Sequence, residues 1–199
     1  MTFHECFVDS IKKQKEKEAK NDIWKDSPYK DLIKLQKNNA GIVGEQIIHN
    51  FCNLNGIDGE CNGVKTKKTG GGDGDGVIMN NSLEVKLAHQ GSSNQSFQHE
   101  LGEVPWNADY MMFIDVSPKC IFLTIFKNFG QKTYKDGLKL ESIFPTKSIT
   151  WRKKKGAFKL DTTIKINETN VEQGRAIKIT SETTDDDIAS YIKKRIENN

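Results

Sequence analysis

Residues 72–86 read Gly72-Asp73-Gly74-Asp75-Gly76-Val77-Ile78-Met79-Asn80-Asn81-Ser82-Leu83-Glu84-Val85-Lys86. A glycine-rich acidic stretch leads into a short apolar run, and a second apolar run follows a two-residue Asn80-Asn81 turn. This pattern predicts a β-hairpin with strands at 76–80 and 82–89. Because side chains alternate between the two faces of a strand, Glu84 and Lys86 share one face of the second strand.

A helix is predicted upstream of this hairpin, from about Asn39 to Asn55. Its apolar residues recur with a period near 3.6, and they are Ile42, Val43, Ile47, Ile48, Phe51, Cys52 and Leu54. Gly41 and Gly44 lie on or near the packing face, where glycine costs about 1 kcal/mol relative to alanine. A close approach to another backbone would compensate for that cost. Glu45 lies at the edge of the same face, so its carboxylate is expected to be partly buried.

The remaining segments predict further strands and helices. Helices are expected over the first 21 residues, from Ser27-Pro28 to Leu35, at 96–103 before Pro105, within 135–144 and at 181–199. Strands are expected at 60–68, 110–116, 120–126 and 176–180, together with a hairpin at 149–166 that turns at Lys155-Gly156. The predicted fold class is α/β, an α+β mixed sheet flanked by helices, in one domain spanning 1–199.

Composition limits the classes of partner. The chain has 199 residues, of which 35% are hydrophobic, and no segment approaches the ~20 apolar residues of a membrane span. No signal-peptide pattern precedes the first helix, so a cytoplasmic location without membrane partners is expected. The four cysteines form no C-x-x-C pair and the four histidines do not cluster, which argues against structural zinc.

Basic residues are concentrated locally although the net charge is only +3. Residues 147–178 hold nine Lys or Arg against three acidic residues. A second cluster contains Lys65, Lys67 and Lys68. Such patches fit a polyanionic partner, and a solvated lysine-rich surface is the alternative interpretation.

The residues of the hairpin suit metal-assisted phosphodiester hydrolysis. Asp75 and Glu84 lie on adjacent strands, where they could bridge one Mg²⁺ ion, with the carbonyl of Val85 as a further ligand. Lys86 could orient or deprotonate the attacking water, or stabilise the transition state. Glu45 could reach the same end of the sheet as a ligand to a second metal or through water. Asp73 is the alternative to Asp75.

In this arrangement the chain resembles the PD-(D/E)xK nuclease superfamily, which has the restriction-endonuclease-like fold. The resemblance lies in a helical Glu45, then Asp75, then Glu84-Val85-Lys86. It covers the αβββαβ core across about 39–127, with added N-terminal helices and a basic β-rich C-terminal extension at about 145–180. Gly74 stands where the family motif has proline. The proline is often missing in this superfamily.

The resemblance implies a metal-dependent deoxyribonuclease that uses Mg²⁺, for which Mn²⁺ can substitute. It implies that Glu45, Asp75, Glu84 and Lys86 are catalytic and that Asp75, Glu84, Val85 and Glu45 hold the metal. The expected activity is sequence-specific cleavage of double-stranded DNA by a type II restriction endonuclease, with a homodimer as one option. A repair or recombination nuclease, an exonuclease and a non-catalytic nucleic-acid-binding module are the alternatives. The candidate DNA-binding residues are Lys65, Lys67, Lys68, Gln95, Gln98, Arg152, Lys153, Lys154 and Lys155.

Overall fold

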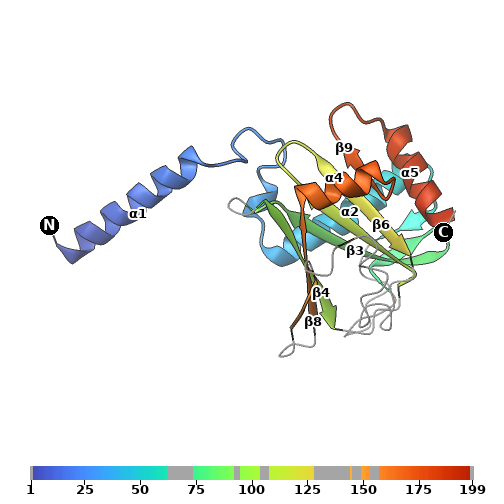
Figure 1. Ribbon diagram of the computed structural model, residues 1–199, viewed down its shortest axis with the longest axis horizontal. Coiled ribbons are helices and arrows are strands. Elements are labelled where there is room, and N and C mark those ends of the chain that lie inside the picture. The colour runs from blue at the N-terminus through green and yellow to red at the C-terminus, as the bar shows by residue number, and fades with distance from the viewer. Residues whose placement is uncertain are drawn as a thin grey trace.

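The computed structural model describes residues 2–61, 74–91, 95–103, 108–127, 144, 149–152 and 157–197 (Figure 1). Its helices are α1 (Phe3–Lys20), the 3-10 helix η1 (Leu32–Lys34), α2 (Lys37–Leu54), α4 (Ile164–Glu172) and α5 (Asp185–Glu197). Its strands are β1 (Gly59–Glu60), β2 (Gly76–Ile78), β3 (Asn81–His89), β4 (Ser96–Glu103), β5 (Tyr110–Val116), β6 (Ile121–Lys127), β7 (Ile149–Arg152), β8 (Ala157–Thr163) and β9 (Ala176–Ile179). Among these helices none is both long and apolar enough to cross a membrane.

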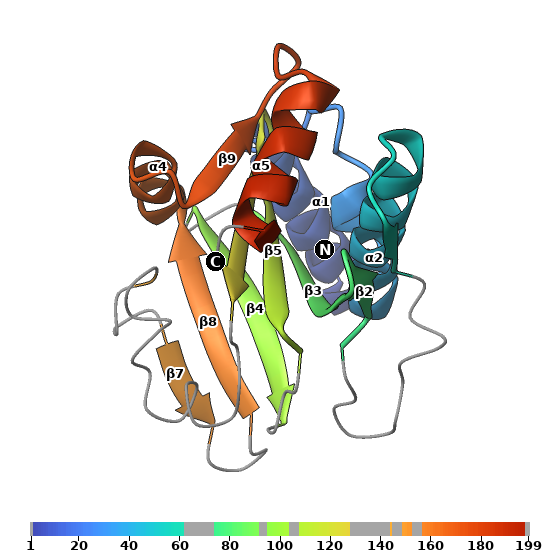
Figure 2. The ribbon, with the colours of Figure 1, turned by 90° about the vertical axis from the view of Figure 1, so that its right-hand side faces the viewer.

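The strands form two sheets. The larger sheet has the order β1-β2-β3-β5-β6-β9, and the smaller sheet has the order β4-β8-β7 (Figure 2). Only the β3–β5 pair is parallel among the strand pairs of the described residues. The prediction of a mixed sheet in a mixed α/β fold is therefore confirmed.

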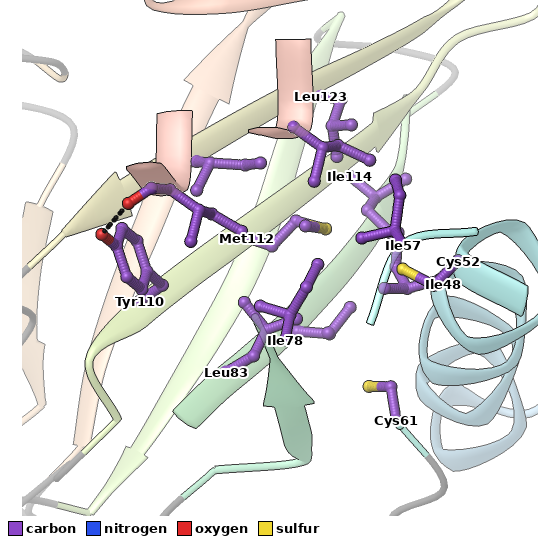
Figure 3. Close-up of a cluster of buried hydrophobic side chains, with 14 of the residues drawn as sticks. Ile48, Cys52, Ile57, Cys61, Ile78, Leu83, Tyr110, Met112, Ile114 and Leu123 are labelled. Carbon is purple, nitrogen blue, oxygen red and sulfur yellow. Dashed lines mark hydrogen bonds between the residues drawn. The ribbon is translucent and has the colours of Figure 1, made fainter. Parts of the chain in front are cut away.

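Helices α2 and α5 cover one face of the larger sheet. Figure 3 shows Ile48 and Cys52 of α2 beside Ile57 and Ile78, with Met112 of β5 in the same cluster. At the other end of this core, the Tyr110 hydroxyl donates a 2.8 Å hydrogen bond to the backbone carbonyl of Ile196 in α5. The smaller sheet packs on the opposite face, where Phe97 of β4 meets Ala88 and Phe122.

The central strands follow the sequence prediction closely. Strand β5 matches the predicted 110–116, and all seven of its residues are buried. Strand β6 lies one residue later than the predicted 120–126. Uninterrupted apolar runs identify such strands because both faces of the sheet are covered.

The prediction of a helix at 96–103 is wrong. This segment is strand β4, which pairs antiparallel with β8. Phe97, His99 and Leu101 are buried, whereas Gln98 and Glu100 are exposed. A period of two is the pattern of a strand with one face on the core, and it outweighs the helical spacing of Phe97 and Leu101.

Several boundaries also differ from the prediction. Residues 27–35 contain turns and only the short helix η1, and the hairpin turn lies at Met79-Asn80 instead of Asn80-Asn81. The predicted 149–166 hairpin is β7 and β8, but it ends at Thr163, whose side chain caps the unpredicted helix α4. The terminal helix begins at Asp185 instead of 181. Of the predicted strand 60–68 only its start lies in the described residues, and of the predicted helix 135–144 only Phe144.

Candidate active site

The β2–β3 hairpin places Asp75 opposite Glu84. Gly76 pairs with Leu83 at the start of β2, and the backbone N–H of Asp75 donates to the Leu83 carbonyl at 2.7 Å. One carboxylate oxygen of Asp75, Oδ2, accepts a 2.8 Å hydrogen bond from the backbone N–H of Val85. The Asp75 side chain therefore extends the ladder by one step before the start of β2 at Gly76.

Gly74 makes this position of Asp75 possible. Its φ is +104°, and a Cβ there would lie 2.4 Å from the Leu83 carbonyl oxygen. Only glycine readily adopts this left-handed backbone conformation, and only glycine fits where there is no room for a Cβ atom. The glycine-rich entry seen in the sequence thus has a steric role, because it brings the chain against β3 just before the carboxylate.

The carbonyl of Val85 shares the edge that Asp75 occupies. In an extended strand the N–H and C=O of one residue point toward the same neighbouring strand. The Val85 N–H is directed to Asp75, so the Val85 carbonyl also faces this side. At this level of the sheet β2 has not yet begun, since it starts at Gly76. A backbone oxygen and a carboxylate consequently converge at the open end of the hairpin.

Glu84 and Lys86 lie on the face of β3 that is turned away from α2. Their side chains form an ion pair and are only 16% and 21% exposed. By register Glu84 is beside Met111 and Lys86 is beside Phe113. The two charges therefore lie at a partly desolvated rim that solvent still reaches, where electrostatic interactions are stronger than in bulk water.

Helix α2 approaches β3 closely through Gly44. A Cβ on Gly44 would lie 3.0 Å from the Leu87 Cβ and 3.4 Å from Cγ1 of Val85. This contact confirms the prediction of close packing for Gly44 but not for Gly41, where a Cβ would meet nothing within 4 Å. Glu45, the next residue along α2, is half-buried, as its position at the edge of the apolar face predicted.

Cys61 is buried against the start of β2, within electrostatic range of three carboxylates. Burial, together with the smaller effect of the negative charges of Asp75, Glu45 and Glu84, raises the pKa of the Cys61 thiol to about 12. Its backbone N–H also donates to Nδ1 of His49 in α2, at 3.4 Å. Nothing in the sequence distinguished Cys61 from the other scattered cysteines, because its neighbours come from α2, the start of β2 and β3.

The hairpin residues include oxygen donors of the type that Mg²⁺ prefers. In the described ranges, which exclude Asp73, no three or more His, Cys, Asp or Glu side chains are grouped closely enough to hold a metal ion. Mg²⁺ is usually held by one or two carboxylates and several waters, together with substrate oxygens. One Asp75 oxygen, Glu84 and the Val85 carbonyl supply such a partial set of hard oxygen ligands. The choice between Asp75 and Asp73 lies outside the described residues, since Asp73 is not among them.

The candidate DNA-binding residues are only partly within the described chain. Lys65, Lys67, Lys68, Lys153, Lys154 and Lys155 lie outside it, and Arg152 is described only as the last residue of β7. Gln95 is exposed, with a φ of +50°, just before β4. Gln98 is exposed on the face of β4 opposite to the buried Phe97, and its register partner is Asp161. The structure therefore does not bring Gln98 to the hairpin site.

A second cluster of polar side chains, which the sequence analysis did not identify, lies buried between the two sheets. The carboxylate of Asp115 in β5 is 2.6 Å from Nε2 of His99. It also accepts hydrogen bonds from Thr162 at 2.7 Å and from Asn167 at 2.6 Å. All four side chains are at most 2% exposed. An aspartate inside the apolar run 110–116 was the one signal that could have indicated this cluster.

Comparisons with known proteins leave the family open. No family model, no curated protein and no solved structure matches this chain.

Proposed function

We propose that this protein is a Mg²⁺-dependent endonuclease that hydrolyses phosphodiester bonds in double-stranded DNA. The observation that carries the proposal is the convergence of an aspartate, a glutamate and a lysine at the open end of one hairpin. Asp75 is fixed by its hydrogen bond to Val85, and Glu84 is paired with Lys86 on the adjacent strand. This is the constellation that the resemblance to PD-(D/E)xK nucleases led us to expect.

Each residue has a chemical role in this proposal. Asp75, Glu84 and the Val85 carbonyl hold the metal, with Glu45 acting from α2 at a second metal or through water. Bound Mg²⁺ would neutralise charge on the scissile phosphate and lower the pKa of a bound water. The Lys86 ammonium, partly shielded from solvent, orients the attacking water and stabilises the charge that develops on the phosphate.

The order of elements supports the same proposal. Helix α2 precedes the β2–β3 hairpin, and β5 lies parallel beside β3, which agrees with most of the expected αβββαβ core. The departure is the connection from β3 to β5, which contains strand β4 where the family core has a helix. Strand β4 belongs to the smaller sheet, so it does not interrupt the larger sheet.

Sequence-specific cleavage as a type II restriction enzyme is our preferred form of this activity. Strand β7 of the smaller sheet ends at Arg152, after which Lys153, Lys154 and Lys155 follow in the sequence, and this addition to the core is of a size to contribute sequence reading. Phosphate contacts by the basic segment would position the protein on DNA. A repair or recombination nuclease or an exonuclease of the same fold would use the same four residues and would differ in its products.

Plasmid cleavage tests the proposal and distinguishes these forms. Supercoiled DNA is incubated with the protein and Mg²⁺ or Mn²⁺, beside a chelated sample. Discrete fragments are the expected result, whereas a smear or a ladder would indicate an exonuclease or a non-specific enzyme. If neither metal supports cleavage, the enzymatic proposal is wrong and a binding module becomes the better interpretation.

A further inference from the structure

Helix α1 has an apolar stripe that is left uncovered by the part of the chain that the structure describes. None of its residues is buried, and Figure 1 shows it projecting away from the rest of the molecule. Phe3, Phe7, Val8 and Ile11 lie at helical spacing and are 88%, 59%, 50% and 44% exposed. Stripes of this kind normally pack against another element, and an isolated helix of about 18 residues is marginally stable in water.

Helix α1, which we call the arm, is joined to the body of the molecule through an anchored residue. Trp24 is 1% exposed and belongs to the main core, where its ring meets that of His89 edge-on at 6.0 Å. Helix α1 ends at Lys20, only four residues before this anchor. The arm therefore leaves the body at a fixed point, with its apolar half at the far end.

Helix α2 carries a second exposed apolar stripe of matching length. Val43, Ile47 and Leu54 recur at i, i+4 and i+11, on one side of the helix. Ile47 and Leu54 are 44% and 84% exposed and Val43 is half-buried, while Gly44 on an adjacent side of the helix packs on β3. Nine of the ten large exposed hydrophobic side chains in the described residues belong to residues 2–54, so the unsatisfied apolar surface is concentrated in these two helices and their connection.

Charge favours a contact between α1 and α2 over a contact between two α1 helices. The second half of α1 carries Lys12, Lys13, Lys15, Lys17 and Lys20 against two glutamates. Two parallel α1 helices would place these lysines side by side. Helix α2 carries only Lys37, Glu45 and His49 as titratable groups besides Cys52. Its exposed positions other than Ile42, Ile47 and Leu54 are Asn38, Asn39, Gln46, Asn50 and Asn53. This amide-rich surface does not repel a basic helix.

We propose that this chain forms a homodimer by arm exchange, in which α1 of each protomer packs its Phe3–Ile11 stripe on the Val43–Leu54 stripe of the other. Twofold symmetry makes this contact twice. Two such contacts would bury on the order of 1,500 Å², within the range of standard stable interfaces. A single α1–α1 contact would bury about half of that area. The proposal does not depend on the catalytic one.

Sedimentation equilibrium of the full chain from about 1 to 100 µM tests this proposal. The expected mass is twice the 22.5 kDa of the chain. Ile47→Ser/Leu54→Ser on α2 and Phe3→Ser/Phe7→Ser on α1 should each weaken dimerisation on the order of 100-fold. These positions are exposed in the monomer, so circular dichroism and urea unfolding should show a folded body. The matched control, Lys12→Ser/Lys17→Ser on α1, should remain a dimer.

Mixing the two weakened variants identifies the exchanged contact. A mixed dimer contains one contact with both stripes intact, between the arm of the α2 variant and the α2 helix of the arm variant. It should therefore form more tightly than either variant associates with itself. A wild-type monomer at 100 µM would overturn the dimer, and an α2 variant that dimerises as tightly as wild type would overturn the arm exchange.

Discussion

Two aspartates on neighbouring parts of the same sheet illustrate two uses of a carboxylate. Asp115 is 2% exposed, and three side chains from β4, β8 and α4 satisfy it. Asp75 is half-buried at the open end of a hairpin, and one of its oxygens accepts a hydrogen bond from Val85. The first carboxylate joins two sheets and is closed to any substrate. The second is fixed in position, and solvent can reach it.

The difference shows why a buried polar cluster is poor support for an active site by itself. A carboxylate whose acceptor capacity is used by protein donors contributes to stability and cannot also bind a metal. Catalysis requires groups that are positioned but incompletely satisfied. The hairpin is therefore the candidate for chemistry and the His99–Asp115 cluster has a structural role, so substitutions at the two places should have different phenotypes.

The largest expected effect is on activity. Asp75→Ala should reduce DNA cleavage at least on the order of 1,000-fold, because it removes a metal ligand. The free energy of unfolding should fall by only about 1 kcal/mol, since one partly exposed hydrogen bond is lost. Cleavage rates and urea unfolding of the same preparation check both numbers. Substantial cleavage by this variant would transfer the role to Asp73.

The reverse pattern is expected at the second carboxylate. Asp115→Ala should destabilise the fold by about 3–5 kcal/mol, because His99, Thr162 and Asn167 lose their common buried acceptor. Urea unfolding measures the change, and Thr162→Val, which deletes one donor, should cost about 1–3 kcal/mol. A stable, folded Asp115→Ala protein that lacks cleavage would instead place Asp115 in the catalytic machinery.

A smaller effect is expected where α2 meets the hairpin. Gly44→Ala adds a methyl group 3.0 Å from the Leu87 Cβ, and overpacking of this kind costs typically about 1–3 kcal/mol. The better helix propensity of alanine offsets about 1 kcal/mol of that cost. Gly41→Ala is the matched control, because a Cβ there meets nothing within 4 Å, so it should be neutral or slightly stabilising. Equal stabilities of the two variants would contradict the close approach of α2 to β3.

The smallest effect concerns pH. The pKa of Cys61 is raised from 9.0 to about 12 in the folded protein, so its thiol remains protonated when the unfolded chain would already ionise. The resulting stability is fully present below about pH 9 and is lost as the pH rises from 9 toward 12. Unfolding measured at pH 8 and pH 10.5 should show a steeper loss for wild type than for Cys61→Ala. If the free energy of unfolding of the two proteins depended on pH in the same way, Cys61 would not lie in a buried, negatively charged environment.

Sequence patterns predicted some parts of this molecule because those parts depend on neighbouring residues. The runs at 110–116 and 120–126, and the Asp75 and Glu84-Val85-Lys86 hairpin, are local patterns of apolar residues, turns and charges. The β4 strand was missed because Phe97 and Leu101 fit a helix until the burial of His99 is known. The Asp115 cluster and the position of Cys61 could not be predicted, since each joins residues from distant segments. The packing of α4 against the smaller sheet could not be predicted for the same reason.

The central claim, that the hairpin is a metal-dependent nuclease site, depends most directly on Lys86. The decisive measurement compares Mg²⁺-dependent plasmid cleavage by the wild-type protein and by Lys86→Ala, with urea unfolding to confirm that both are folded. We expect cleavage by wild type and a loss on the order of 100- to 10,000-fold in the variant. No cleavage by wild type, or unchanged cleavage by folded Lys86→Ala, would contradict it.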